Sequence, residues 1–182
     1  MHERDEGLRE TSIERLGQLQ PVHTESGMHT AGTSAQIADG ASAVLLVSER
    51  AVAEFGLRPL ARVVDSILVG SDPILMLTGP IPATHSLLER NKLSIDDIDV
   101  FEINEAFASV VLAWAHDLKP DMQRVNPNGG ALAMGHPLGA TGTALVAKAV
   151  HELVRDDREQ AVVSVCCGGG LATGTLLRRV GL

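Results

Sequence analysis

The stretch Ala140-Thr-Gly-Thr-Ala-Leu-Val-Ala-Lys-Ala-Val-His-Glu-Leu-Val-Arg155 decides the fold class of this chain. Its aliphatic residues recur at helical spacing, with Leu145, Ala149 and Leu153 on one face, so it predicts an amphipathic helix. The next apolar run, Ala161-Val-Val-Ser-Val165, is short and rich in valine, which is typical of a buried strand. A long helix followed at once by a buried strand indicates an α/β protein.

The same alternation of apolar runs and helical patterns extends toward both ends of the chain. The predicted strands cover 41–47, 61–69, 98–103, 161–165 and 171–177, and the predicted helices cover 48–56, 81–92, 105–117 and 140–155. This order predicts a layered α/β fold of the type βαβαβαββ, with helices on both faces of a mixed sheet that is mainly parallel. The last two strands are expected to form an antiparallel edge pair.

Composition and charge narrow the class of protein. The net charge is −8 without a concentrated run of Lys or Arg, which argues against nucleic-acid binding. No apolar run approaches the ~20 residues of a membrane span, and there is no secretory start. The two cysteines, Cys166 and Cys167, are adjacent and therefore poorly placed to bridge, so a reducing compartment fits. We expect a cytoplasmic protein with no nucleic-acid or membrane partner.

His136 lies in the Gly-rich segment that precedes helix 140–155, between Gly135 and Pro137. The glycine leaves the imidazole uncovered, and the free N–H groups at the start of the helix favour an anion nearby. A neutral imidazole there could deprotonate a thiol or donate to a developing oxyanion. A histidine that simply occupies an exposed loop fits the pattern equally well.

A second Gly-rich segment, Val165-Cys-Cys-Gly-Gly-Gly170, follows a predicted strand. One of its cysteines could act as a nucleophile or as an acid/base, and the glycine N–H groups could bind an oxyanion. The alternative is a pair of small apolar residues at a strand end.

Asn104 stands where a strand gives way to a helix, and it could cap that helix or hold a water or substrate. Phe107 fits either the core or a pocket wall. The remaining histidines lack the spacing of a metal site, so we expect no metal. The sequence contains neither a G-x-G-x-x-G after a predicted strand nor a P-loop lysine, so its glycine-rich turns give only a weak signal for a nucleotide site.

Three motifs taken together are specific: Asn104-Glu-Ala-Phe107, Gly135-His-Pro137 and Cys166-x-Gly-Gly-Gly170. They resemble the C-terminal signatures of the thiolase family, as do Asn126-Pro-Asn-Gly-Gly130 and Gly79-Pro-Ile-Pro82. The resemblance covers nearly the whole chain from about residue 5 and implies a thiolase-like C-terminal core. Residues 51–182 would form the C-terminal domain, and residues 1–50 would be a remnant of the loop domain and the end of the N-terminal core.

The thiolase resemblance implies CoA-thioester chemistry: cleavage of a 3-ketoacyl-CoA by CoA, or the reverse Claisen condensation. It implies that His136 activates a nucleophilic cysteine, that Asn104 holds a water of the oxyanion hole, and that Cys166 is the acid/base. It also implies that the N–H of Gly168 belongs to a second oxyanion hole. Cys167 stands where the family usually has an aliphatic residue, which implies packing. The residues implied on the substrate side are Ser34, Ala35, Phe107 and Pro80. CoA and acyl-CoA enter as substrates, no bound cofactor is implied, and members of the family form homo-oligomers.

Two departures from the family pattern qualify these expectations. The family often has a serine at Ala35, where it contacts the pantetheine arm, and Met76-Leu77 replaces a glycine-containing turn. Nothing in the chain matches the family's nucleophilic cysteine, which lies in an N-terminal half. We therefore expect a C-terminal thiolase region that is catalytic when a separate N-terminal fragment completes the site. The alternatives are a non-catalytic truncated product serving as a CoA-binding or oligomerisation module, and Cys166 or Cys167 as an improvised nucleophile.

Overall fold

The computed structural model describes residues 3–181 and contains one four-stranded sheet in the order β1-β4-β3-β2. The strands are β1 (Ala61–Gly70), β2 (Val100–Ile103), β3 (Gln160–Cys167) and β4 (Leu171–Arg179). β2 and β3 are parallel, whereas β4 is antiparallel to both of its neighbours. The sheet is therefore mixed, which confirms that prediction, but two of its three pairings are antiparallel, so the prediction that it is mainly parallel is wrong. The hairpin of the last two strands is antiparallel as predicted, but it occupies the centre of the sheet instead of an edge.

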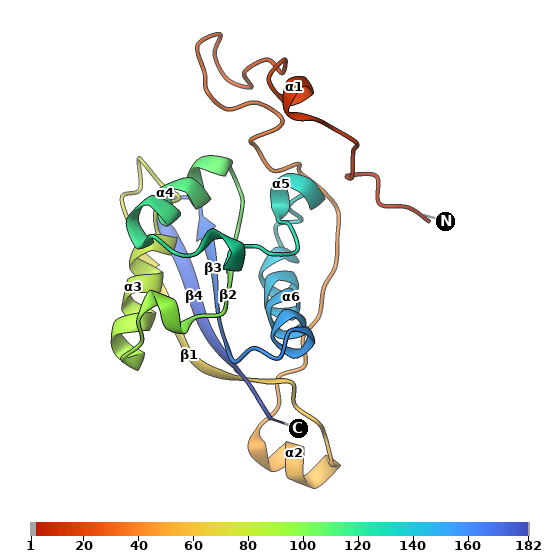
Figure 1. Cartoon of the computed structure of the whole chain (residues 1–182), viewed down its shortest axis with the longest axis vertical. Helices are drawn as coiled ribbons and strands as arrows, with labels where there is room; N and C mark the ends of the chain where they lie inside the picture. The colour runs from red at the N-terminus through yellow and green to blue at the C-terminus, as the bar shows by residue number, and fades with distance from the viewer. Residues whose placement is uncertain (1–2, 182) are drawn as a thin grey trace.

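Helices cover both faces of the sheet, as predicted (Figure 1). α3 (Pro80–Asn91) and α4 (Ala108–Leu118) lie on one face, and α6 (Thr141–Arg155) lies on the other. The short helices are α1 (Ile13–Leu16), α2 (Glu49–Phe55) and α5 (Ala131–Met134), with 3₁₀ turns at Ile95–Asp97 and Met122–Arg124. None of the helices in the described part of the chain is long and apolar enough to cross a membrane.

The alternation of side chains in β2 divides the core into two clusters. Phe101 and Ile103 point toward α3 and α4, whereas Val100 points toward α6, because successive side chains of a strand face opposite sides. On the α6 face, Leu145, Ala149 and Leu153 are all buried, which confirms the helix face predicted from the sequence. The helix therefore forms where its aliphatic stripe has a sheet to cover.

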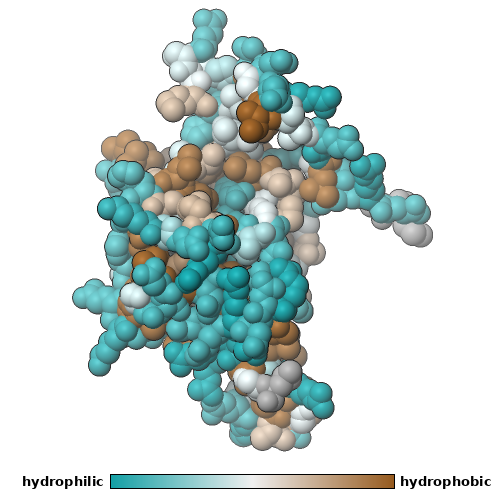
Figure 2. Space-filling model, in the orientation of Figure 1, coloured by the Kyte–Doolittle hydropathy of each residue, from teal (hydrophilic) through white to brown (hydrophobic). Residues whose placement is uncertain are grey.

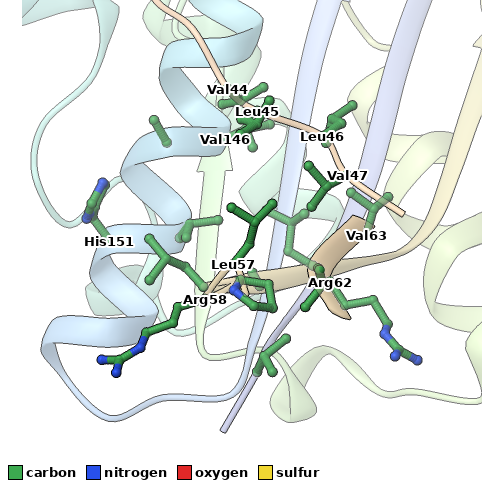
Figure 3. A pocket seen from close by; sticks show the side chains of 18 of the residues that line it. Val44, Leu45, Leu46, Val47, Leu57, Arg58, Arg62, Val63, Val146 and His151 are labelled. Atoms are coloured by element: carbon green, nitrogen blue, oxygen red, sulfur yellow. The ribbon is translucent and has the colours of Figure 1, made fainter. Parts of the chain in front are cut away.

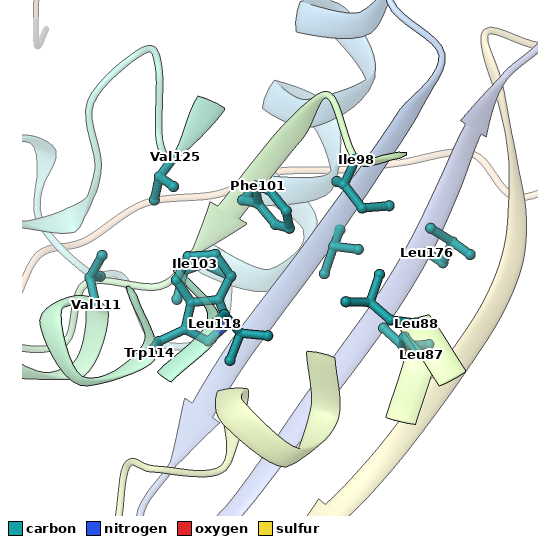
Figure 4. Close-up of a cluster of buried hydrophobic side chains, with 11 residues drawn as sticks. Leu87, Leu88, Ile98, Phe101, Ile103, Val111, Trp114, Leu118, Val125 and Leu176 are labelled. Atoms are coloured by element: carbon teal, nitrogen blue, oxygen red, sulfur yellow. The ribbon is translucent and has the colours of Figure 1, made fainter. Parts of the chain in front are cut away.

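The larger cluster is organised around Trp114, which is fully buried (Figure 4). Its ring lies 5.1 Å from that of Phe101 in an edge-on arrangement. The indole Nε1–H donates to Thr84 Oγ1 at 2.9 Å, and the Thr84 hydroxyl donates to the carbonyl of Pro80 at 2.8 Å. These bonds satisfy the buried polar atoms of Trp114 and Thr84 and join α4 to the first turn of α3.

Residues 41–47 are not a strand, which contradicts the sequence-based prediction. The segment is an irregular, extended stretch that runs past α6 (Figure 1). Leu45 and Leu46 are 80% and 73% exposed. A strand needs a hydrogen-bonded neighbour, and no other segment within residues 3–181 pairs with this one. The apolar composition of the run is real, but its partner is not among the described residues.

Glu102 is a carboxylate buried inside this fold. Its Oε2 lies 2.9 Å from Lys148 Nζ, which also donates to the carbonyl of Gly129. Its other oxygen, Oε1, has no hydrogen-bond partner within residues 3–181. Burial raises the pKa of Glu102 to about 7, against the opposing attraction of Lys148. The Glu102–Lys148 pair thus links β2 to α6 and to the loop that contains Gly129, but burying the Glu102 carboxylate costs desolvation free energy.

We expect Thr84→Val to lower the free energy of unfolding by about 1–3 kcal/mol, because it leaves the buried indole N–H of Trp114 without an acceptor. Urea denaturation followed by the fluorescence of Trp114, the single tryptophan of the chain, measures the effect. Thr24→Val, at an exposed loop position, is the control. Equal stability of the two variants would contradict the prediction.

We expect the pH dependence of stability to reveal Glu102. Because its pKa is raised from 4.5 to about 7, the folded state binds the proton more tightly than the unfolded chain, so its contribution is full below pH 4.5 and is lost as the pH rises through 7. The free energy of unfolding, relative to that of Glu102→Gln, should fall by about 2–3 kcal/mol between pH 4.5 and 8. Parallel pH profiles of the two proteins would show that Glu102 titrates normally.

Candidate functional site

Two of the predicted site residues stand at the carboxyl ends of the neighbouring parallel strands β2 and β3. Asn104 directly follows β2, and its N–H donates to the carbonyl of Ser164 at 2.9 Å, so it extends the pairing of the two strands. Cys166 lies near the end of β3. Asn104 and Cys166 are 1% and 6% exposed, so both are sequestered from bulk water.

His136 is brought to the same place by the turn between α5 and α6. Gly135 has φ +87°, and a Cβ at this position would lie 2.8 Å from the Cβ of Ala38, so a glycine is required here. The N–H of His136 then donates to the carbonyl of Gln36 at 2.7 Å. The imidazole Nε2 lies 3.3 Å from Asn104 Nδ2, and Nδ1 lies 2.7 Å from Thr141 Oγ1.

These contacts assign the imidazole tautomer. The hydroxyl of Thr141 donates to the carbonyl of Pro137 at 3.0 Å, so Thr141 Oγ1 accepts from Nδ1–H of His136. The lone pair is then on Nε2, which faces the amide of Asn104. Burial lowers the pKa of His136 from 6.5, so the ring is neutral at pH 7. The arrangement therefore presents Nε2 as a base.

The pKa of Cys166 is shifted in the opposite direction from that of His136. Burial raises the pKa of its thiol, and the neighbouring Cys167 adds to this, while its backbone and a hydrogen bond from the Asn104 side chain act in the other direction. The thiol is therefore protonated at neutral pH and suited to give a proton. The side chain of Asn104 interacts with both His136 and Cys166, and its Oδ1 has no hydrogen-bond partner within residues 3–181.

After Cys166 the chain turns through Gly168–Gly170, which we call the glycine turn. Cys167, Gly168 and Gly169 are exposed, and Gly169 and Gly170 have φ of +77° and +82°. Gly168 is therefore within two residues of the Cys166 thiol, with its backbone accessible to a ligand. Cys167, predicted to serve packing, is exposed and points away from the buried face that holds Cys166.

Ser34, Ala35 and Phe107 are also brought together, through a short bridge between two loops. The N–H of Ala35 donates to the carbonyl of Ala106 at 3.0 Å, and the hydroxyl oxygen of Ser34 is buried without a partner among the described residues. The ring of Phe107 is half-buried and lies 5.0 Å from that of His29, outside both core clusters.

α4 begins at Ala108 with Phe107 in the N-cap position, so Asn104 does not cap that helix, and the capping interpretation is wrong. Pro80 is buried at the start of α3. The preceding Gly79 packs against Ala172, the cross-strand partner of Cys166, so the start of α3 lies on the same face of the sheet as the Cys166 side chain.

Two residues that shape this site were missed in the sequence. Thr141 orients His136, and its signal was a hydroxyl five positions after the histidine. Glu105 accepts from Asn126 Nδ2 at 2.8 Å and from the N–H of Leu132 at 3.1 Å, so it fixes the loop that leads to His136. A Cβ at Gly130 would overlap the Glu105 carboxylate, which explains the glycine there.

The described residues contain no group of three or more His, Cys, Asp or Glu side chains that could hold a metal ion.

A cavity of about 950 Å³ lies outside the candidate site, between residues 43–47, the start of β1 and one side of α6 (Figure 3). Its walls are mostly aliphatic, with Leu45, Val63 and Val146 among them, and none of the predicted site residues lines it. In Figure 2, apolar side chains also reach the surface near the lower end of the molecule, above α2.

Comparison with known proteins gives a consistent result. Residues 57–179 match the family described as thiolase, C-terminal domain, and residues 1–50 match thiolase, N-terminal domain. The chain is 53% identical over 176 residues to the steroid 3-ketoacyl-CoA thiolase FadA6 of Mycobacterium tuberculosis. This match covers 97% of the chain and 43% of that relative. It is 45% identical to the 3-oxoadipyl-CoA/3-oxo-5,6-dehydrosuberyl-CoA thiolase of Escherichia coli, covering 97% of the chain and 45% of that protein.

Solved structures agree with the sequence matches. Human mitochondrial 3-ketoacyl-CoA thiolase, which has also been solved in complex with CoA, superimposes with a TM-score of 0.94 at 43% identity. The match covers 97% of this chain and 45% of the human chain. The Bacillus anthracis acetyl-CoA acetyltransferase matches with a TM-score of 0.94 at 38% identity and the same coverage. The chain thus spans less than half the length of the relatives it matches. Since its fold, its two matched domain families and its relatives agree, the chain belongs to the thiolase family.

Proposed function

We propose that this chain supplies the acid/base half of a thiolase active site, which acts on CoA thioesters of 3-keto acids. The observation that carries the proposal is the position of Asn104: its Nδ2 lies 3.3 Å from Nε2 of His136, and it continues the pairing of β2 with β3, the strand that contains Cys166. A neutral imidazole base and a protonated thiol are thereby brought to the same end of the β2–β3 pair. This is the pair of groups that cleavage of a 3-ketoacyl-CoA, or the reverse condensation, requires.

In the cleavage direction, a nucleophilic thiol gives its proton to Nε2 of His136 and attacks the C3 carbonyl of the substrate. The C2–C3 bond breaks, and the electron pair goes to C2. The thiol of Cys166 gives its proton to C2, which releases acetyl-CoA. The Cys166 thiolate then takes the thiol proton of incoming CoA. The CoA sulfur attacks the acyl-enzyme, and the departing sulfur recovers its proton from His136.

Negative charge on the two carbonyl oxygens needs donors that are already in place. We assign the backbone N–H of Gly168 to one oxyanion and a water held by Asn104, with His136, to the other. The exposure of Gly168 and the unpaired Oδ1 of Asn104 support these roles. Ser34, Ala35 and Phe107 form the substrate side, where a CoA arm passes, and Pro80 belongs to it from the start of α3.

The nucleophilic thiol comes from residues outside these 182, in an N-terminal thiolase half. Both cysteines of the sequence lie side by side at the end of β3, and Cys166 is used as the acid. Residues 1–50 belong with that half, and residues 51–182 form the C-terminal domain. The exposed aliphatic side chains of residues 43–47 support this division, since no other segment within the described chain pairs with them.

We also propose that the complete protein is a cytoplasmic homo-oligomer. The free cysteines favour the cytoplasm, and the apolar surface beside residues 43–47 favours the oligomer.

A second candidate is a non-catalytic module for CoA binding or oligomerisation. The aliphatic cavity of about 950 Å³ beside residues 43–47 favours it, because the cavity is an interaction surface distant from the proposed chemistry. The two candidates differ in what they require of His136 and Cys166, which only the catalytic one uses.

We expect the chain, mixed with the N-terminal half of the Mycobacterium tuberculosis relative, to catalyse thiolysis of acetoacetyl-CoA. Cys166→Ala and His136→Ala should each lower kcat by about 100- to 10,000-fold, because each removes a proton-transfer group. The assay follows loss of the absorbance of the 3-ketoacyl-CoA–Mg²⁺ complex, and His23→Ala, on an exposed loop, is the control.

Two results would contradict this proposal. Full activity of the Cys166→Ala mixture would remove the acid/base role and leave the non-catalytic module. Thiolysis by the chain alone, lost in Cys166→Ala, would place the nucleophile inside these residues.

We expect His136 to titrate below pH 6.5 in the isolated chain, because burial disfavours the imidazolium form. The neutral base is therefore still present at pH 6.5 and is lost only as the pH falls through the lowered pKa. Nitrogen-15 NMR of the imidazole should also show the proton on Nδ1 in the neutral ring. In Thr141→Val the preference for Nδ1–H should weaken, since its acceptor is removed. An unchanged tautomer ratio would show that Thr141 does not orient the ring.

A further inference from the structure

The glycine turn has no side chains of its own to hold it. Three consecutive glycines have more conformational freedom than any other tripeptide, and fixing them has the highest entropic cost. A backbone N–H that stabilises an oxyanion must nevertheless be fixed before charge develops. If Gly168 has the role proposed above, some other part of the chain must hold the turn.

The segment Ser71–Leu77, which we call the clamp loop, lies against the glycine turn. The N–H and the hydroxyl of Ser71 both donate to the carbonyl of Gly170, at 2.5 and 3.0 Å. A Cβ at Gly170 would lie 2.6 Å from the carbonyl oxygen of Ser71, so the two backbones are in direct contact. The clamp loop thus holds the end of the turn where β4 begins.

The opposite side of the turn is held by a side chain. The N–H of Gly169 donates to the thioether Sδ of Met76 at 3.1 Å. This bond fixes the peptide unit that joins Gly168 to Gly169. The N–H of Gly168 belongs to the preceding unit, which starts at Cys167, the last paired residue of β3, so Gly168 is held between the strand on one side and the Met76 contact on the other. A thioether is a weak acceptor, so the bond depends on how firmly Met76 itself is held.

The backbone of the clamp loop is arranged to present Met76. Met76 and Leu77 both have left-handed φ, +55° and +60°, a conformation that is costly for residues with branched or long side chains. The carboxylate of Asp72 accepts from the N–H groups of Ile74 and Leu75, and its carbonyl accepts from the N–H of Met76 at 2.9 Å. The same two N–H groups, that of Leu75 first, lower the pKa of Asp72.

Both ends of the clamp loop are anchored in the sheet. It follows β1, which pairs with β4, and two residues after its end Gly79 packs against Ala172 at the start of β4. Met76 and Leu77 therefore lie between two segments, β1 and Gly79, that both pack against β4, the strand that follows the glycine turn. A displacement of the clamp loop should therefore also move the glycine turn, and a substitution of Met76 should first affect the hydrogen bond of Gly169.

We propose that Met76 is a positioning residue, whose thioether fixes the glycine turn so that the N–H of Gly168 keeps the orientation needed to bind an oxyanion. The inference rests on the proposed role of Gly168 but concerns contacts within the chain itself. It assigns a purpose to the two left-handed residues that replace a more permissive glycine-containing turn.

The test uses three variants of the isolated chain. Met76→Leu keeps the apolar side chain and removes the acceptor, Met76→Gln restores an acceptor on an unbranched side chain, and Met122→Leu makes the same replacement at an exposed methionine elsewhere. The rate of amide hydrogen exchange at Gly168 and Gly169, measured by NMR magnetisation transfer from water, reports on the turn.

We expect Gly169 exchange to be about three- to tenfold faster in Met76→Leu, as for the loss of one hydrogen bond. It should return to within about twofold of the wild-type rate in Met76→Gln and be unchanged in Met122→Leu. The amide resonance of Gly168 should shift in Met76→Leu alone. A wild-type exchange rate in Met76→Leu, or a failure of Met76→Gln to restore it, would overturn the proposal.

Kinetics separate this inference from the proposed function. In the mixture with an N-terminal half, Met76→Leu should lower kcat severalfold with KM unchanged, because an oxyanion donor acts in the transition state. A change in KM alone would overturn the positioning role. If the wild-type mixture has no activity, the proposed function fails, and the exchange rates still decide whether Met76 holds the turn.

Discussion

The pairing of β2 with β3 is the constraint on which the site depends. Because the two strands are parallel, their carboxyl ends meet at one edge of the sheet, and residues 62 positions apart in the sequence become neighbours. Asn104 continues this pairing by one further hydrogen bond to Ser164. Asn104 is consequently fixed at the end of the sheet where β3 contains Cys166, and only His136 comes from outside the sheet.

Rigid and permissive parts of the chain have separate tasks. Strands and long helices hold Asn104 and Cys166, whereas the groups that must approach a ligand lie on glycine-containing turns. The turns are then immobilised from outside: Gln36 and Thr141 hold His136, Glu105 holds the loop before it, and Ser71 holds the end of the glycine turn. Except for the bond from Thr141, each of these bonds comes from a distant part of the sequence, so the site is ordered only when the whole domain is folded.

Local patterns in the sequence predicted the helices on both faces and four of the five strands, because helical spacing and alternation are properties of the segments themselves. They also singled out His136, Asn104 and Cys166 by residue type and surroundings. These patterns could not predict the direction of β4 or its central place in the sheet, because alternation within a strand does not specify which strands lie next to it. For the same reason residues 41–47 were misassigned. The orientation of His136 by Thr141 depends on the geometry of one turn, which no periodicity encodes.

The irregular segment that contains Leu45 and Leu46 has a consequence for the behaviour of the chain in the cell. Ala43-Val-Leu-Leu-Val47 is uncharged, lacks proline and glycine, and is rich in β-branched and aliphatic residues, a combination that favours aggregation. The net charge of −8 opposes self-association between whole molecules, but no acidic side chain lies within this segment. Until these side chains are covered, the segment is therefore the part of the described chain from which we expect self-association to start.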